Sequence, residues 1–450
     1  QGERAKRGEI DVMIGPRSAL FTPFPNIGLI IMDEEQESSY KSENAPKYHA
    51  REVAEEVARL HGGSVLLGSA TPSMEAYYRA KHGEYKLFTL KERLTGGSLP
   101  AVYTVDLREE LKNGNRSIFS EKLKELMTDR LQKKEQIMLF LNRRGYAGFV
   151  SCRSCGHVMK CPHCDVSLSE HRDSRLVCHY CGYSIPAVKR CPECGSPYIS
   201  GFRAGTQQIE DKVKEMFPEA RVLRMDQDST AAKDAHEKLL ARFADHEYDI
   251  MVGTQMVAKG LDFEDVTLVG VLGIDSLLFG QGFRAYESVF SLITQVVGRG
   301  GRAELPGRAL IQTSVADHPV LQLAAAQDYE GFYREEITFR RFGLYPPFCS
   351  FVVIGFIGDQ EGAVLIAAQR FGVLLGEHAA QKPDIPLRIL GPAPMNITML
   401  NNKFRYKLTL KCRNDAAFRA LLHETLDAYD AEKLPQKASV ILDFNSDGDL

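Results

Sequence analysis

The sequence predicts an α/β protein built on parallel sheets, with a cysteine-rich insertion and a smaller C-terminal region. The first observation behind this prediction is that short apolar runs recur along the chain and end in polar clusters, which is typical of buried parallel strands. The second is that stretches with helical periodicity separate these runs. Alternating strands and helices indicate an α/β sheet, whose chemistry gathers at the carboxyl ends of its strands.

The apolar runs give the expected strands. They are residues 29–32, 65–67, 137–141, 222–223, 250–252 and 266–272. Polar residues follow them, for example Asp33 after the first run and Ser69 close behind the second. Residues 121–133 predict a helix with one apolar face. That face consists of Leu123, Leu126, Met127 and Leu131.

The order of these elements predicts the domain organisation. Residues 1–110 belong to a first lobe, and residues 111–150 and 196–318 form a second lobe that the insertion at 151–195 interrupts. A connector, 319–345, ends at Pro346-Pro347. Residues 346–450 form a C-terminal domain, with strand-like runs at 351–356 and 406–410 and a helical run at 362–378.

Composition and charge exclude few functions. The chain has 450 residues, of which 44% are hydrophobic and 26% charged, and these values are ordinary for globular proteins. A net charge of −3 argues mildly against a nucleic-acid binder, but it leaves room for a local basic groove. There is no run of eighteen apolar residues and no secretory leader, so we expect a cytoplasmic protein without a membrane span. Because the chain starts at Gln1 within apparent working sequence, we expect it to be an N-terminally truncated fragment.

Eight of the ten cysteines form four CxxC pairs and predict two zinc sites. The pairs are Cys152/Cys155, Cys161/Cys164, Cys178/Cys181 and Cys191/Cys194. Two thiolates separated by two residues can hold one tetrahedral ion, and Gly156, Gly182 and Gly195 suit the tight turn that follows such a pair. A disulfide framework would need an oxidising compartment, and a redox CxxC would stand alone. The histidines among the pairs are then outer or surface groups, because eight thiolates complete two sites.

The four CxxC pairs can share two zinc ions in two ways. In a nested arrangement the outer pairs share one ion and the inner pairs the other, whereas in a sequential arrangement neighbouring pairs share an ion. We favour nesting, because it closes the insertion at its base, where the chain must leave and re-enter its host lobe.

An acidic cluster, Asp33-Glu34-Glu35-Gln36, follows the first expected strand. An aspartate at this place can hold Mg²⁺, and the next glutamate can polarise the water that attacks a γ-phosphate. A solvated acidic turn would have the same sequence, so the cluster needs support from other motifs.

Three further motifs supply that support. Residues 68–72 (GSATP) form a loop of small residues after the second strand. Residues 253–255 (GTQ) and 259–262 (KGLD) offer backbone amides and a carboxylate to phosphate and ribose. Residues 295–302 (QVVGRGGR) place Arg299 and Arg302 three positions apart, and on a helix this spacing projects both guanidinium groups to one side as arginine fingers.

In this order these four motifs resemble those of superfamily-2 helicases. With the cysteine array placed after residues 140–147 (FLNRRGYA), the chain is identified as a member of the primosomal protein N′ (PriA) family of bacterial replication-restart helicases. Residues 15–24 (GPRSALFTPF), 33–48 (DEEQESSYKSENAPKY), 275–287 (DSLLFGQGFRAYE) and 391–393 (GPA) also fit, so the resemblance covers essentially the whole chain. Gln36, Gly300 and Pro16 depart from the commoner family residues without removing a charge that the mechanism requires.

The resemblance implies a fold and a set of site residues. The fold has two RecA-like lobes, the first incomplete, a two-zinc insertion in the second, and a small α+β C-terminal domain. Asp33 and Glu34 are the Mg²⁺ and hydrolysis carboxylates. Gln295, Arg299 and Arg302 face the nucleotide, and Gly260 and Asp262 bind it. The DNA-binding residues are Arg17, Ser18, Tyr40, Lys41, Arg143, Arg144 and Thr254.

Residues 37–48 resemble the family's aromatic-rich loop, which can stack on bases and report DNA occupancy to the neighbouring carboxylates. The alternative is an ordinary surface loop that contains two tyrosines. We interpret the segment as the functional loop.

The implied function is that of an ATP-dependent 3′–5′ DNA helicase of replication restart, with two Zn²⁺ ions and with Mg²⁺ bound to ATP. Its partners are branched or forked DNA, single-stranded DNA, primosome and helicase-loading proteins, and single-stranded-DNA-binding protein, but no membrane. The alternatives are a DNA translocase that does not unwind and a fragment that only binds DNA or primosome proteins.

The sequence holds no GxxxxGK[ST] phosphate loop, which the family carries upstream of Asp33. We therefore expect the 450-residue chain alone to have negligible ATPase. Robust DNA-stimulated turnover by this chain would contradict that expectation.

Overall fold

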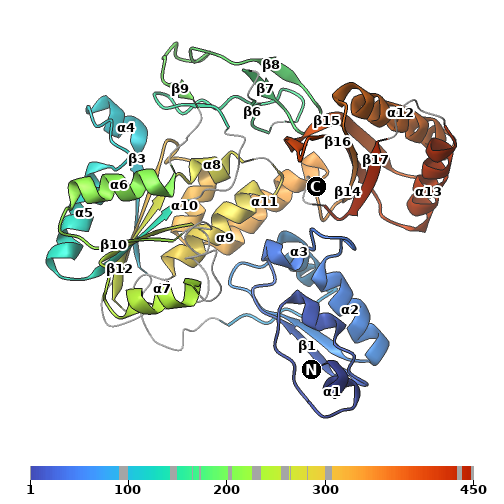
Figure 1. Ribbon diagram of the computed structural model, residues 1–450, viewed down its shortest axis with the longest axis horizontal. Coiled ribbons are helices and arrows are strands. Elements are labelled where there is room, and N and C mark those ends of the chain that lie inside the picture. Colours follow the sequence, from blue (N-terminus) through green and yellow to red (C-terminus); the bar gives the residue numbers. More distant parts are fainter. Residues whose placement is uncertain are drawn as a thin grey trace. The chain divides into compact units, whose positions relative to one another are not determined.

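The computed structural model describes two compact units of the chain (Figure 1). One unit combines Gln1–Leu87 with Phe339–Leu450, and the other is Phe88–Thr338. The described residues are 2–90, 100–141, 149–164, 166–171, 174–200, 205–225, 235–254, 263, 265–280, 282–298, 307–432 and 438–446. Among the helices in these ranges, none has both the length and the apolar character needed to cross a bilayer.

A six-stranded parallel sheet is the centre of the unit Phe88–Thr338. Its strands, in spatial order, are β10 (Val222–Met225), β11 (Ile250–Gly253), β4 (Gln136–Leu141), β12 (Val266–Leu272), β13 (Arg308–Thr313) and β3 (Ala101–Asp106). Every residue of β4, β11 and β12 is buried, as continuous apolar runs require in a sheet covered on both faces. The structure therefore confirms the predicted α/β class and the strands at 137–141, 250–252 and 266–272.

Helices connect and cover these strands. They are α4 (Leu107–Lys112), α5 (Glu121–Gln132), α6 (Thr206–Met216), α7 (Ala235–Ala244), α8 (Asp275–Leu278), α9 (Ala285–Val297), α10 (Pro319–Ala325) and α11 (Tyr329–Gly343). Helix α5 begins after Ser120, whose hydroxyl accepts from the Leu123 amide at 3.2 Å, and this N-cap satisfies an otherwise unpaired donor. Its apolar face, including buried Leu123 and Leu126, packs into the core beneath the sheet.

Strand β3 belongs to the six-stranded sheet, although the apolar pattern of the sequence does not predict this strand. The sequence predicts a first lobe that extends to residue 110, but Ala101–Asp106 pairs in parallel with Arg308–Thr313 at the edge of the six-stranded sheet. Its sequence AVYTVD alternates and is only half-buried, because an edge strand needs no continuous apolar run. The pattern used to find central strands therefore missed it.

The N-terminal part of the other unit holds a two-stranded parallel sheet. Strands β1 (Leu29–Met32) and β2 (Ser64–Leu67) pair in register from Leu29 with Ser64 to Met32 with Leu67. Around them lie α1 (Gly2–Lys6), η1 (Arg17–Phe21), η2 (Ser38–Tyr40), α2 (Ala50–His61) and α3 (Met74–Lys81). One face of the sheet packs against α2, where Met32, Ala50 and Ala54 are buried together.

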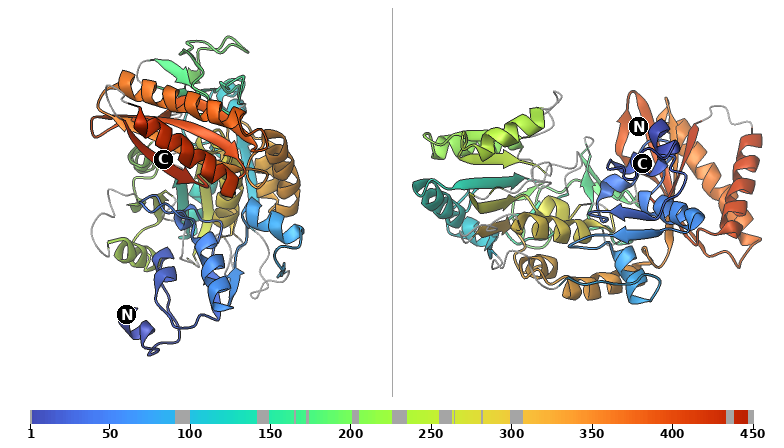
Figure 2. Two further views of the ribbon diagram at one scale, coloured as in Figure 1. Left: turned by 90° about the vertical axis from the view of Figure 1, so that its right-hand side faces the viewer. Right: turned by 90° about the horizontal axis from the view of Figure 1, so that it is seen from below.

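The C-terminal part of the same unit is a four-stranded antiparallel sheet in the order β15, β16, β14, β17. These strands are β14 (Ser350–Gly358), β15 (Leu387–Leu400), β16 (Lys403–Cys412) and β17 (Ser439–Phe444). Helices α12 (Glu361–Ala380) and α13 (Ala416–Ala431) lie side by side on one face of this sheet (Figure 2). Their buried face includes Phe371 and Phe418, which share one apolar core with Ile354 and Leu408 of the strands.

The cysteine-rich insertion is closed by a short antiparallel pair. Strands β5 (Ser151–Cys152) and β9 (Ile199–Ser200) meet at its base, and β6 (Ser169–Glu170), β7 (Arg175–Val177) and β8 (Ser184–Pro186) form a small sheet within it. The chain thus leaves and re-enters the second unit at neighbouring points.

Candidate functional site

The acidic cluster begins directly after β1, at the carboxyl end of the two-stranded sheet. Asp33 and Glu34 are both exposed. Glu34 has φ of 49°, a left-handed conformation that costs a non-glycine residue about 1–3 kcal/mol. Its amide donates to Asp33 Oδ1 at 3.0 Å. Strain of this kind, held by the surrounding structure, is typical of functional turns.

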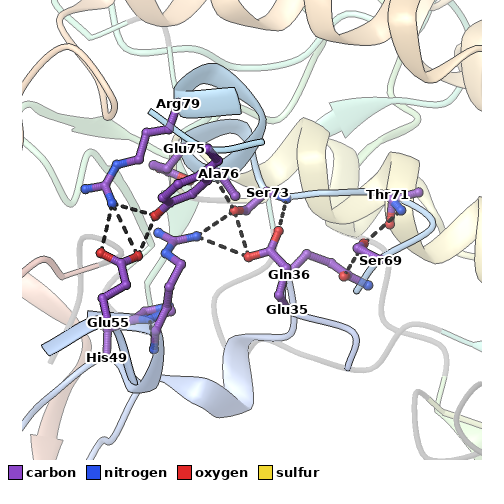
Figure 3. A network of polar contacts seen from close by, with 12 residues as sticks. Glu35, Gln36, His49, Glu55, Ser69, Thr71, Ser73, Glu75, Ala76 and Arg79 are labelled. Atoms are coloured by element: carbon purple, nitrogen blue, oxygen red, sulfur yellow. Dashed lines mark hydrogen bonds and ion pairs between the residues drawn. The ribbon is translucent and has the colours of Figure 1, made fainter. Parts of the chain in front are cut away.

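A side-chain bridge joins the acidic cluster to the loop after β2. The Gln36 amide nitrogen donates to Glu34 Oε2 at 2.6 Å, and its oxygen accepts from the Ser69 hydroxyl at 2.5 Å. The Thr71 amide donates to Ser69 Oγ at 2.9 Å (Figure 3). The two predicted motifs, 33–36 and 68–72, are therefore brought together by direct hydrogen bonds.

Glu35 is the residue of this cluster whose role the sequence did not reveal. It is 2% exposed, and its carboxylate accepts from the Ser73 amide at 2.6 Å and from Arg51 Nη1 at 3.1 Å. Arg51 also donates to the Ser73 hydroxyl at 2.8 Å. Ser73 caps α3, and a serine before a helical run was the one signal that could have marked this place. The buried network fixes the first turn of α3 to the acidic loop (Figure 3).

Replacing Glu35 with alanine is expected to destabilise the chain by about 3–5 kcal/mol, because it leaves the Arg51 guanidinium buried without its carboxylate. The midpoint of chemical unfolding of the 450-residue chain measures this effect. Glu56→Ala is the control: Glu56 pairs with Arg59 on the exposed surface of α2, where an ion pair adds little to stability, so its loss is expected to leave the unfolding midpoint nearly unchanged. Equal shifts for the two variants would contradict the structural role of Glu35.

The aromatic-rich loop is held close to the acidic cluster. Tyr40 packs on the core around Met32 and donates its hydroxyl to the Asp33 carbonyl at 2.7 Å. Burial, followed by the charge of Asp33, raises the pKa of Tyr40, so its hydroxyl stays a donor. Tyr48 packs on the same core and meets Phe21 edge-on, with ring centroids 5.2 Å apart.

The predicted DNA-binding residues of η1 and of the aromatic-rich loop differ in their exposure and contacts. Ser18 is exposed. Arg17 Nη1 donates to the carbonyls of Ser39 and Lys41, each at 2.6 Å. Lys41 is 9% exposed, and its ammonium donates to Asp443 Oδ1 at 2.7 Å. These contacts occupy Arg17 and Lys41 within the protein, and their assignment to DNA stays a prediction.

The unit Phe88–Thr338 contains the remaining predicted residues that the structure describes. Thr254 follows β11 at the carboxyl end of the six-stranded sheet and is half-buried. Gln295 is half-buried near the end of α9. The other predicted residues lie outside the described residues, and their roles stay predictions. They are Arg143, Arg144, Gly260, Asp262, Arg299 and Arg302.

The eight cysteines gather in two groups of four, and the pairing is nested. Cys152, Cys155, Cys191 and Cys194 form one group, and Cys161, Cys164, Cys178 and Cys181 form the other. In each group the Sγ atoms all lie within 4.8 Å of one another. The Sγ atoms of Cys152 and Cys194 are 3.6 Å apart, as are those of Cys161 and Cys181. Four sulfurs each about 2.3 Å from a tetrahedral Zn²⁺ would be about 3.8 Å apart, so the donor sets fit zinc.

The backbone of three CxxC pairs makes the turn that such a site needs. The amides of Gly156, Gly182 and Gly195 donate to the carbonyls four residues before them at 2.8, 2.9 and 2.9 Å. All three glycines have φ between 70° and 80°, which a residue with a Cβ adopts at a cost. The glycines that the sequence analysis noted are therefore required by the turn geometry, and two Cys₄ sites for zinc are supported.

Comparisons with known families agree with this description. Residues 199–304 match the helicase conserved C-terminal domain, residues 161–186 match the PriA DNA helicase Cys-rich region domain, and residues 342–446 match the primosomal protein N C-terminal domain. Among solved structures, the chain is similar to RecG bound to a three-way DNA junction (TM-score 0.36, 13% identity, 77% of this chain and 34% of that chain). The fold and the cysteine clusters define a helicase-like α/β protein with a zinc-binding insertion.

The curated relatives are replication restart proteins. The chain is 45% identical to replication restart protein PriA of Bacillus subtilis over 98% of this chain and 54% of the relative, and 44% identical to that of Synechocystis over 90% and 49%. The chain belongs to the PriA family. It spans about half the length of these relatives.

Proposed function

We propose that the protein as its gene encodes it is an ATP-dependent 3′–5′ DNA helicase that acts on branched replication forks and starts primosome assembly. The observation that carries the proposal is the acidic loop after β1, in which strained Glu34 is tied through Gln36 to Ser69. A loop built in this way can hold a reacting group and pass a change in nucleotide state to its neighbour. The family's name as a replication restart protein supports DNA as the substrate.

In this proposal the residues divide into three groups. Asp33 would hold Mg²⁺, which supplies charge neutralisation to the phosphates, and Glu34 would orient the attacking water and accept its proton. Gln295, Arg299 and Arg302 would complete the phosphate site from the second lobe, with Gly260 and Asp262 binding the nucleotide. The DNA would be held by a third group, consisting of Arg17, Ser18, Tyr40, Arg143, Arg144 and Thr254. Lys41 belongs to the same predicted group, and its contact with DNA stays a prediction because its ammonium pairs with Asp443.

The zinc-binding insertion would serve strand separation or partner docking rather than catalysis. Each group offers four thiolates to one ion, and a tetrahedral ion with four protein ligands has no open position for a substrate. Primosome proteins, helicase loaders and single-stranded-DNA-binding protein are the proposed partners, and such an enzyme would work in the bacterial cytoplasm.

ATP hydrolysis with and without forked DNA tests this function. The gene-encoded protein is expected to hydrolyse ATP slowly alone and at least about tenfold faster with a fork, because closure of the two lobes on the nucleotide would require bound DNA. A rate that forked DNA does not change would contradict the proposal.

A further inference from the structure

A buried ion pair joins the loop beside the acidic cluster to the last strand of the chain. Lys41 Nζ lies 2.7 Å from Asp443 Oδ1 and also donates to the Phe444 carbonyl at 2.7 Å. The two side chains are 10% and 4% exposed, although 402 residues separate them in sequence. Lys47 Nζ lies 3.7 Å from the other oxygen of Asp443. Removing one partner of such a pair leaves a buried charge without compensation, so the contact resists displacement.

Lys41 follows directly after Tyr40, whose hydroxyl contacts the backbone of Asp33. In η2 the Lys41 amide donates to the Ser38 carbonyl at 3.1 Å, which makes Ser38–Lys41 a tight turn. Tyr40, in the same turn, donates its hydroxyl to the Asp33 carbonyl. One tight turn and one hydrogen bond therefore connect Lys41 to the backbone of Asp33.

Asp443, at the other end of the ion pair, lies in strand β17 of the C-terminal sheet. Asp443 pairs with Val353 of the central strand β14. Its neighbours Leu442 and Phe444 pack against the C-terminal core, so alternation along β17 directs Asp443 to the opposite face of the sheet. Strand pairing and the packing of both neighbours therefore hold the backbone of Asp443 in place.

We infer that Asp443 is a positioning residue of the acidic loop: through Lys41 and Tyr40, the C-terminal sheet fixes the backbone at Asp33 and so sets the rate of hydrolysis. The rate claim rests on the function proposed above, whereas the anchoring itself does not. The buried ammonium of Lys41 is then a structural anchor.

Hydrogen exchange of the 450-residue chain tests the anchoring without any enzymatic readout. In Lys41→Met and in Lys41→Met/Asp443→Leu, the amides of Tyr40, Lys41 and Ser42 are expected to exchange at least about tenfold faster than in the unchanged chain. The double variant removes both charges of the 2.7 Å pair, so that only Lys47, whose side chain is 17% exposed and lies farther from Asp443, loses a partner. Leu421→Ala, which opens a cavity in the core of the same C-terminal sheet, is the control and should leave these amides unchanged. Unchanged exchange in both Lys41 variants would overturn the inference.

ATPase kinetics of the gene-encoded protein test the consequence for rate. Lys41→Met, Asp443→Leu and the double variant are each expected to lower kcat about ten- to a hundredfold, because a misplaced catalytic group costs rates of this order. The double variant should be no slower than either single variant, since all three break one contact. Asp443→Glu should recover most of kcat.

A merely structural pair would instead give a double variant with both unfolding midpoint and kcat restored, and that result would overturn the inference. Absence of DNA-stimulated ATPase in the unchanged protein would defeat the proposed function, while the exchange experiment would still decide the anchoring.

Discussion

Replacing Glu34 with glutamine in the gene-encoded protein is expected to lower the rate of DNA-stimulated ATP hydrolysis about a hundred- to ten-thousandfold while leaving ATP binding intact. Glutamine keeps the size of the side chain and an oxygen that can accept from Gln36, so the bridge to Ser69 can persist. It removes the carboxylate that would accept a proton from the attacking water, and a positioned base contributes about a hundred- to ten-thousandfold to such a reaction. The measurement is steady-state hydrolysis together with equilibrium binding of a labelled nucleotide.

The control for this experiment is Glu56→Gln. Glu56 is exposed on α2 and pairs with Arg59, away from the acidic loop, so the variant should hydrolyse ATP at the unchanged rate. Normal turnover by Glu34→Gln would remove Glu34 from its proposed role. Loss of both hydrolysis and nucleotide binding would instead mean that the strained turn itself had collapsed.

Loss of one cysteine from either group is expected to release one zinc ion per chain and to unfold the insertion around it. Structural zinc contributes on the order of 10 kcal/mol to the folding of small metal domains, and the insertion has only short strands to replace it. Cys161→Ser and Cys191→Ser test the two groups separately, because each residue belongs to a different one. Metal analysis should give two zinc ions in the unchanged chain and one in each variant.

Cys349→Ser is the matched control for the zinc experiment. Cys349 lies outside both groups and donates its thiol hydrogen to the Leu344 carbonyl at 3.0 Å, a contact that serine can keep. This variant should therefore retain both ions. One zinc ion or fewer in the unchanged chain would contradict the account of the cysteine clusters.

The parts of this fold that could be predicted from the sequence are those with a strong local signal. The buried strands β4, β11 and β12 are continuous apolar runs, and such runs, alternating with helical stretches, are typical of a parallel sheet covered on both faces. The spacing of the cysteines left nested and sequential pairing open, and the need to close the insertion at its base favoured nesting. The structure confirms the nested pairing, with β5 and β9 meeting at that base.

The parts that could not be predicted depend on contacts between distant residues. The local sequence indicates that Lys41 is a basic residue in a solvated loop. Its side chain is instead buried against Asp443 of the last strand, and no local pattern predicts the burial of Lys41. Glu35 reads as one of three consecutive acids, yet it alone is buried, because Arg51 and Ser73 fold back onto it. Edge strand β3 has no continuous apolar run. In each case tertiary context decides the role of a residue whose sequence signal is ordinary.

Strand displacement on a forked DNA substrate tests the central claim most directly. With ATP, the gene-encoded protein is expected to release the displaced strand, moving 3′ to 5′ on the strand it tracks, and the Glu34→Gln variant is expected to release none. DNA-stimulated hydrolysis of ATP without any strand release would contradict the claim that this member of the PriA family is a helicase.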